Sequence, residues 1–256
     1  MFKDEFAAVA QAAVSKRDFL KNKPVAYFVS SMLAGMFIAF GVFICFTMGS
    51  VFQGEAAQKL VMGITFSVAL SLVVIAGAEL FTGNNLVMTA GALNGTVGWG
   101  SVIKLFVVCY IGNWIGSVIA ALLFSATGLL SGDLAIYMAE SAATKMAIPV
   151  GGLIARAIFC NMLVCLAVWC GFRCKNEAAK LIMIMLCILT FVACGFEHSV
   201  ANMSMLTLGL LAPAEAAVSI GGYFYNILLV TVGNMIGGML FVAVPYYMFQ
   251  RNKKAK

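Results

Sequence analysis

The sequence predicts an all-α membrane protein whose six transmembrane helices form two inverted three-helix repeats. Three observations carry this prediction. First, 63% of the 256 residues are hydrophobic and only 10% are charged, whereas soluble domains carry about 25% charged residues. Second, the hydrophobic residues fall into blocks longer than roughly 18 residues, a length at which a membrane span is a simpler interpretation than a buried core helix. Third, polar residues interrupt two of these blocks at matching places in the two halves of the chain.

The first 24 residues precede the hydrophobic blocks and carry mixed apolar and charged positions. Asp4 and Glu5 stand where a secretory signal carries only positive charge, and no apolar core follows closely. We therefore expect no cleaved signal. We interpret residues 1–24 as a short amphipathic helix on the cytoplasmic side.

Short polar or glycine-containing connections separate the blocks that we interpret as spans. The predicted spans are 25–49, 61–92, 99–124, 149–172, 181–212 and 223–249. We expect one transmembrane channel domain, with 25–124 as the first repeat, 149–249 as the second, and 250–256 as a basic cytoplasmic tail.

The second and fifth spans are too long to be straight helices. Each has 32 residues, which at 1.5 Å per residue exceeds the roughly 30 Å hydrocarbon core by more than half. Polar residues lie at the middle of both, in AELFTGNN from Ala78 and in FEHSVANM from Phe196. We expect both spans to break there, since the free backbone groups of helix ends need a cavity lined by protein or water.

The third and sixth spans carry matching glycine patterns, Gly112-Asn-Trp-Ile-Gly116 and Gly233-Asn-Met-Ile-Gly237. The distance from Glu79 to Gly112 is 33 residues, and from Glu197 to Gly233 it is 36. We infer two copies of three spans, and an odd number of spans inverts the second copy. Broken helices at matched positions predict the transport site. The alternative is that two short glycine motifs coincide by chance.

Lysine and arginine predict the orientation, because their excess in loops stays in the cytoplasm. Twelve lie on the side of the two termini, whereas the opposite loops hold only Lys59 and Lys145. We expect both termini to lie on the cytoplasmic side of the cell membrane. The net charge of +6 then indicates contact with anionic lipid rather than with nucleic acid.

Enzyme chemistry and bound cofactors are not indicated by the sequence. The eight cysteines lie in or at the ends of spans, and no pair has the C-x-x-C spacing of a metal or redox site. A haem oxidoreductase needs axial ligands, which a single histidine hardly supplies. We therefore expect no metal, no cofactor and no enzymatic activity.

The candidate site lies at the two breaks. His198, the only histidine, is predicted to lie near mid-membrane. An ionisable side chain is costly there, so its presence indicates a functional role. The alternative is a neutral core histidine hydrogen-bonded to a hydroxyl. Thr82 either faces the pore beside His198 or caps a helix. Glu79 and Glu197 are expected to cap helix N–H groups rather than to transfer protons.

Further residues extend this site, each with a plainer alternative. Asn161 and Asn234 are either polar pore residues or helix-to-helix hydrogen bonds. Lys145, in the outer loop before Pro149, either draws anions to the mouth or is merely solvated. Arg156 is expected to extend toward the interface or to pair with an acid. The expected dry constrictions, which are equally residues of ordinary packing, are Leu70, Leu80, Phe81 and Phe191. The residues expected to support the breaks are Glu79, Gly83, Asn84, Glu197 and Asn202.

The motifs AELFTGNN, FEHSVANM, NMLVCLAVW and GNMIGG closely resemble the formate/nitrite transporter family over essentially the whole chain. This resemblance implies an aquaporin-like fold in a homopentamer with one pore per subunit. It further implies that Thr82 and His198 form the central pair. The same resemblance makes Leu70, Leu80, Phe81 and Phe191 the constrictions and Lys145, Asn161 and Asn234 the polar pore residues.

The resulting functional prediction is a channel or transporter for small monovalent anions of weak acids, namely hydrosulfide, formate or nitrite. Within the family, the chain looks most like the hydrosulfide branch. The continuation Gly83-Asn84-Asn85 differs from that of formate channels, which argues against formate but does not by itself identify another anion. A bare anion crosses a dry constriction at a cost of several kcal/mol or more, so we expect His198 to donate a hydrogen bond or a proton. The alternative is an aquaporin-like channel for neutral solutes, although no Asn-Pro-Ala motif is present.

Overall fold

The computed structural model describes residues 2–212 and 214–250, and every regular element in them is helical. In chain order these are α1 Lys3–Asn22, α2 Pro24–Val51, α3 Gln58–Phe66, α4 Val68–Leu72, η1 Val73–Gly77, α5 Phe81–Leu93, α6 Trp99–Ala126, α7 Gly132–Met146, α8 Val150–Arg173, α9 Glu177–Ala193, α10 Ser199–Leu211, α11 Ile220–Gly238, η2 Met239–Ala243 and α12 Val244–Gln250. The elements η1 and η2 are π-helical turns. The predicted tail beyond residue 250 lies outside the described residues.

Five helical stretches in the described part of the chain are long and apolar enough to cross a membrane. They are Pro24–Val51, Gln58–Gly77, Trp99–Ala126, Val150–Arg173 and Ile220–Gln250. The predicted fifth span is divided between α9 and α10, so no single helix there has the required length. The all-helical membrane fold is confirmed, and the count of six spans stays a prediction.

Both predicted interruptions are confirmed. The second span leaves helical geometry between Gly77 and Phe81, and the fifth leaves it between Ala193 and Ser199. A glycine with positive φ starts each turn, Gly77 at 84° and Gly195 at 73°, a conformation that side chains other than glycine rarely adopt. We call residues 78–80 the first break and residues 194–198 the second break.

The glycine patterns of α6 and α11 bring helices of this chain together. A Cβ added at Gly116 would overlap the backbone of Met32 in α2, and one added at Gly237 would overlap the backbone of Ile158 in α8. Small residues permit such close approach of helix backbones in membranes. Each pattern therefore joins the third or sixth span to the first span of its own half, α2 or α8.

Helix α7 was not expected, because residues 125–148, between the third and fourth predicted spans, were interpreted only as a connection. It packs against α10 and buries Met138, Ala139 and Ala142 completely. Lys145 therefore lies in the last turn of a helix and not in an irregular loop. This placement fixes the lysine relative to the second break.

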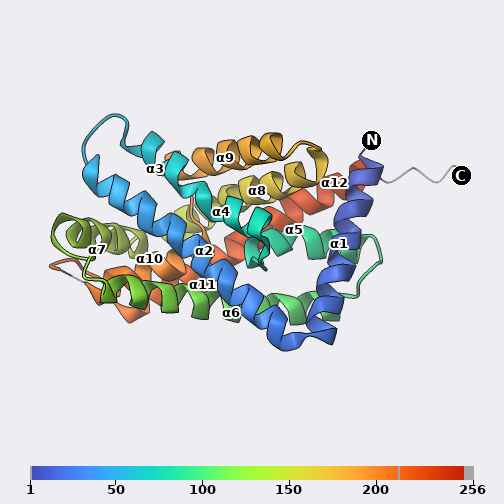
Figure 1. Cartoon of the computed structure of the whole chain (residues 1–256), viewed down its shortest axis with the longest axis horizontal. Coiled ribbons are helices and arrows are strands. Elements are labelled where there is room, and N and C mark those ends of the chain that lie inside the picture. Colours follow the sequence, from blue (N-terminus) through green and yellow to red (C-terminus); the bar gives the residue numbers. More distant parts are fainter. Residues whose placement is uncertain (1, 213, 251–256) are drawn as a thin grey trace, which may run out of the picture.

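The amphipathic helix α1 is docked on the protein. Phe6, Val9, Ala10 and Ala13 are completely buried, largely against α5. Figure 1 shows α1 and α12 at one end of the molecule and α7 at the opposite end. Burial of one apolar side chain from water contributes about 1.5–3 kcal/mol to stability. With four such residues buried, α1 is a stable part of the folded protein at the end where α12 also lies.

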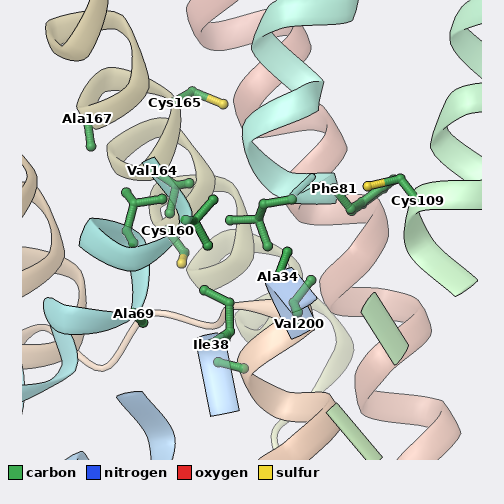
Figure 2. Close-up of a cluster of buried hydrophobic side chains, with 14 of the residues drawn as sticks. Ala34, Ile38, Ala69, Phe81, Cys109, Cys160, Val164, Cys165, Ala167 and Val200 are labelled. Atoms are coloured by element: carbon green, nitrogen blue, oxygen red, sulfur yellow. The ribbon is translucent and has the colours of Figure 1, made fainter. Parts of the chain in front are cut away.

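Apolar side chains fill the space between the helices around the breaks. Figure 2 shows part of this core, in which Val200 of α10 lies beside Ala34 and Ile38 of α2. Phe81, which starts α5, is in the same cluster. The polar groups of the breaks are thus held in a closely packed apolar surround.

Candidate functional site

The N-termini of two short helices meet at the centre of the molecule. Thr82 is in the first turn of α5, and His198 directly precedes α10. The Thr82 Oγ1 and His198 Nε2 atoms are 3.0 Å apart, and both residues are buried. The structure therefore brings the predicted pair into hydrogen-bonding contact.

The hydrogen bonds of His198 define its tautomer. Its Nδ1 atom accepts a bond from the Ala201 backbone N–H at 3.0 Å and so caps helix α10. An accepting Nδ1 carries no proton, so in the neutral ring the hydrogen is on Nε2. The imidazole is therefore the donor to the Thr82 hydroxyl. This leaves the hydroxyl hydrogen of Thr82 free for another acceptor.

At the first break, the Glu79 carboxylate is an acceptor for three side chains. Lys16 of α1 donates to it at 2.7 Å, Asn84 of α5 at 3.0 Å and Tyr27 of α2 at 3.2 Å. The expectation that this glutamate caps helix N–H groups is wrong, because its partners are side chains. Glu79 instead ties α1, α2 and α5 together.

The second break repeats this arrangement with α7 in place of α1. Lys145 donates to the Glu197 carboxylate at 2.7 Å and Asn202 donates to it at 2.6 Å. Asn202 also bonds to the side chain of Asn226 in α11 at 2.8 Å. Glu197 likewise does not cap a helix, since its carboxylate accepts from side chains.

Two asparagines provide the bonds that hold the broken backbone. Asn113 of α6 accepts from the Phe81 N–H and Asn234 of α11 accepts from the Ser199 N–H, both at 2.9 Å. Each also donates to the carbonyl of the glutamate in its break at 2.9 Å. Sequence reasoning missed Asn113, although it stands second in GNWIG exactly as Asn234 stands second in GNMIG; the repeated motif was the available signal.

Asn161 differs from Asn234 in how many of its polar atoms are used. Its amide nitrogen donates to the Asn234 carbonyl at 2.6 Å, but its Oδ1 has no hydrogen-bond partner in the part of the chain that the structure describes, although the residue is buried. Asn234 uses its oxygen and both of its amide hydrogens within the protein. Asn161 therefore retains an acceptor, and Asn234 serves as a helix-to-helix connection.

Two cavities approach the Thr82–His198 pair from opposite ends. The cavity on the α7 side has a volume of about 460 Å³ and is lined by Lys145, Phe191 and His198 among others. The cavity on the α1 side has a volume of about 680 Å³ and is lined by Lys16, Leu70, Leu80 and Gly83 among others. We call them the α7-side cavity and the α1-side cavity.

The expected constriction residues do not all line these cavities. Leu70 and Leu80 border the α1-side cavity, and Phe191 borders the α7-side cavity. The Phe191 ring stacks on the His198 imidazole with centroids 6.0 Å apart. Phe81 borders neither cavity and packs edge-on against Tyr110 of α6 at 5.0 Å.

Phe66 and Lys16 are neighbours of the site that the sequence did not indicate. Phe66 borders the α7-side cavity and meets Phe191 edge-on at 5.6 Å. It precedes Leu70 by four residues, so it lies on the same helical face, and this spacing was the available signal. Lys16 had no such signal, because its pairing with Glu79 depends on how α1 docks.

Comparison with known proteins places these features in one family. The profile described as "Formate/nitrite transporter" matches residues 3–248. The nitrite transporter NirC of Salmonella typhimurium is 37% identical over 249 residues, covering 96% of this chain and 91% of the relative. The formate channel FocA of Escherichia coli is 32% identical over 264 residues, covering 94% of this chain and 92% of the relative.

Solved structures give the same result for the fold. A protein described as "FNT family ion channel" superimposes with a TM-score of 0.93 at 36% identity and covers 98% of this chain and 100% of its own. A protein described as "Pentameric formate channel with formate bound" has a TM-score of 0.81 at 27% identity and covers 90% of this chain and 98% of its own. Because these similar proteins are named as transporters and channels, the chain is a transport protein and not an enzyme.

Proposed function

Because the chain belongs to the formate/nitrite transporter family, we propose that it is a membrane channel or transporter for small monovalent anions of weak acids. The chain is a multi-pass membrane protein. In this proposal the anion moves between the two cavities and passes Thr82 and His198. The observation that carries the proposal is the meeting of two helix N-termini at that pair.

The meeting of α5 and α10 creates a local preference for negative charge. Each helix N-terminus has the equivalent of roughly half a positive charge and points free N–H groups outward. The Thr82 hydroxyl, which accepts from His198, presents its hydrogen in the same place. A small anion therefore finds donors here, whereas a cation meets two positive helix ends.

The apolar residues on either side of the Thr82–His198 pair determine whether the substrate crosses as the anion or as the neutral acid. Leu70 and Leu80 flank the pair on one side, and Phe191 with Phe66 on the other. A charge without partners is costly in such a place, but the neutral acid of a weak-acid anion is not. We propose that the anion takes a proton from a hydronium ion in one cavity, crosses the constrictions as the neutral acid, and returns the proton to the water of the other cavity.

In this mechanism His198 orients rather than exchanges protons. Its Nδ1 is used by the α10 backbone, and a second ring proton would break that bond beside a positive helix end. The Nε2–H group instead fixes the Thr82 hydroxyl, and Thr82 donates a hydrogen bond to the passing acid. Asn161, with its free Oδ1, can accept the hydrogen of the neutral acid.

We also propose the substrate, the internal repeat and the oligomeric state that the sequence predicts. Hydrosulfide is the favoured substrate because of the resemblance to the hydrosulfide branch of the family, and the Gly83-Asn84-Asn85 continuation argues only against formate. Nitrite and formate are the competitors, because the relatives NirC and FocA are named for these ions. The two halves, 25–124 and 149–249, form inverted repeats around the breaks. We further propose a homopentamer, as in the pentameric formate channel.

The orientation follows from the distribution of lysine and arginine. Both termini and the α1-side cavity face the cytoplasm, and the α7-side cavity faces outward. Anionic lipid is the expected partner of the basic cytoplasmic surface.

The proposal is tested by flux into proteoliposomes of the purified protein. Hydrosulfide, formate, nitrite and chloride are compared at two pH values, together with osmotic water flux. We expect weak-acid anions to exceed chloride, to move faster at the lower pH, and to be reduced in the His198→Phe variant. Water flux without anion flux would instead support the neutral-solute channel. Equal chloride flux would contradict passage as the neutral acid.

A further inference from the structure

Arg156 occupies a position that can be compared directly between the two breaks. The Glu197 N–H donates to the Arg156 carbonyl at 3.4 Å, and the Glu79 N–H donates to the Ser30 carbonyl at the same distance. The next residues agree, since Asn234 donates to the Ala157 carbonyl and Asn113 to the Ser31 carbonyl. Arg156 and Ser30 are therefore equivalent positions in the two halves.

The two side chains border equivalent cavities but differ in charge. Arg156 lines the α7-side cavity and Ser30 lines the α1-side cavity. The arginine is exposed, seven residues into α8. The structure thus places a positive charge at one entrance where the other entrance has a neutral hydroxyl.

The other charges of the α7-side cavity balance one another. Lys145 is bound to Glu197 at 2.7 Å, and Lys59 and Glu140 contribute one charge of each sign. Within residues 2–212 and 214–250, no carboxylate oxygen lies within 4.0 Å of the Arg156 guanidinium. The expected pairing of Arg156 with an acid is therefore not found among these residues. Lys59 also has no carboxylate from this part of the chain within 4.0 Å, but Glu140 offsets its charge in the same lining, so the cavity carries one positive charge in excess.

The excess positive charge of the α1-side cavity is held in an ion pair. The lining of this cavity carries Lys16, Lys180 and Glu79. Lys16 is bound to Glu79 at 2.7 Å, and Lys180 is bound at 2.8 Å to Glu177, which lies outside the lining. At the equivalent positions, the α7-side cavity therefore has an arginine without a carboxylate partner, and the α1-side cavity has the neutral Ser30.

We propose that Arg156 is an anion-capture residue that makes the α7-side entrance the high-affinity entrance of the pore. This inference rests on the proposed function as an anion pathway. A guanidinium offers several fixed N–H donors and stays charged at all physiological pH values, so it binds a small monovalent anion at the mouth. Lys145 is less available for this task, because its ammonium group is already paired.

The test compares uptake by cells that express the protein, with labelled formate or nitrite as the probe. Half-saturating concentration and maximal rate are measured at about 0.01 M ionic strength with sucrose and at about 0.15 M, where the Debye length falls from about 30 to about 8 Å. Arg156→Ser, which copies the residue of the other cavity, is expected to raise the half-saturating concentration about three- to tenfold at low salt. The maximal rate stays within a factor of two, and the effect shrinks at the higher salt.

Three further variants make the result specific. Arg156→Lys keeps the charge and is expected to stay close to the wild type at low salt. Lys104→Ser removes one charge from a residue that lines neither cavity and is expected to change nothing. Ser30→Arg is expected to lower the half-saturating concentration for efflux, which tests the inference even if Arg156→Ser does not fold.

The outcomes separate this inference from the proposed function. If the wild type carries no anion, the proposed function fails. If the wild type transports and Arg156→Ser leaves the half-saturating concentration unchanged at low salt, only the role of Arg156 is overturned. The same holds if the Arg156→Ser effect does not depend on salt, or if Lys104→Ser shows it equally.

Discussion

The two breaks share one set of supporting contacts, which we call the frame, but differ in the residue that follows the glutamate. In both, a lysine from a neighbouring helix binds the glutamate, and an asparagine of α6 or α11 bonds to the first N–H of the next helix. The residue after the glutamate differs. It is Leu80 in the first break, where no side chain caps α5, and His198 in the second, where the imidazole caps α10.

The comparison separates the residues that build the site from those that act in it. The lysine–glutamate pairs and the asparagines that both halves share hold the N-termini of α5 and α10 in place. This role does not depend on the substrate. The unmatched residues, Thr82 and His198, come from different halves and complete one another across the centre at 3.0 Å. The matched groups therefore form the scaffold, and the unmatched residues form the polar centre.

The largest expected effect comes from removing the charge of one glutamate. Glu197→Gln leaves Lys145 without its partner, and breaking a buried ion pair in this way costs about 3–5 kcal/mol. Glu79→Gln is expected to cost less, because the Glu79 side chain is 11% exposed and that of Glu197 is 3% exposed. Thermal unfolding in detergent measures both.

A double variant sharpens this prediction. Lys145→Met together with Glu197→Gln is expected to regain part of the lost stability, because no unpaired charge remains. Equal losses of thermal stability in Glu79→Gln and Glu197→Gln would mean that the different burial of the two glutamates does not affect the stability of the protein.

The next effect concerns the residue in which the breaks differ. His198→Leu copies the first break into the second and removes the donor that orients Thr82. Loss of one oriented donor in a dry site costs about a hundredfold in rate, so we expect weak-acid anion flux to fall by about that factor. His198→Gln retains an N–H donor and is expected to retain more flux. Unchanged flux in His198→Leu would show that the asymmetry has no role in transport.

Several features of this frame could be predicted from the sequence. Span length together with polar residues at mid-span predicted both breaks, since a helix that is too long for the bilayer must leave helical geometry somewhere. The glycine patterns predicted close helix contacts. These signals are local, because they depend on periodicity and on residue size within one segment.

The rest depends on contacts between distant segments. Lys16 and Glu79 are 63 residues apart in the chain, and only the docking of α1 brings them together. The same holds for Lys145 and Glu197, which meet because the unexpected helix α7 packs on α10. Because the docking of α1 and α7 cannot be read from the sequence, capping of a helix was the simpler prediction for both glutamates. The sequence also could not tell whether Phe81 forms a constriction or only packs in the core.

A smaller effect is expected for the asparagines that the two halves share. Asn113→Ala and Asn234→Ala each remove three hydrogen bonds to the backbone and leave buried backbone groups unsatisfied, which costs about 1–3 kcal/mol. Because the two sets match, we expect equal losses of stability, measured by thermal unfolding. Asn113→Asp and Asn234→Asp serve as controls that keep the acceptor. Very unequal losses would contradict the equivalence of the two frames.

The smallest effect is expected at Thr82, whose equivalent in the second half is Val200. Thr82→Val keeps the shape and removes the hydroxyl, so the passing acid loses one donor while both helix ends and His198 remain. A single hydrogen bond between neutral groups contributes about 0.5–1.5 kcal/mol, so we expect flux to fall by up to about tenfold. Thr82→Ser is expected to retain most of the flux. Val200→Thr adds a hydroxyl at the matched position, where Val200 is completely buried, and is expected not to rescue Thr82→Val. Rescue by Val200→Thr would mean that either half can supply the hydroxyl, and the proposed pairing of Thr82 with His198 would then lose its specificity.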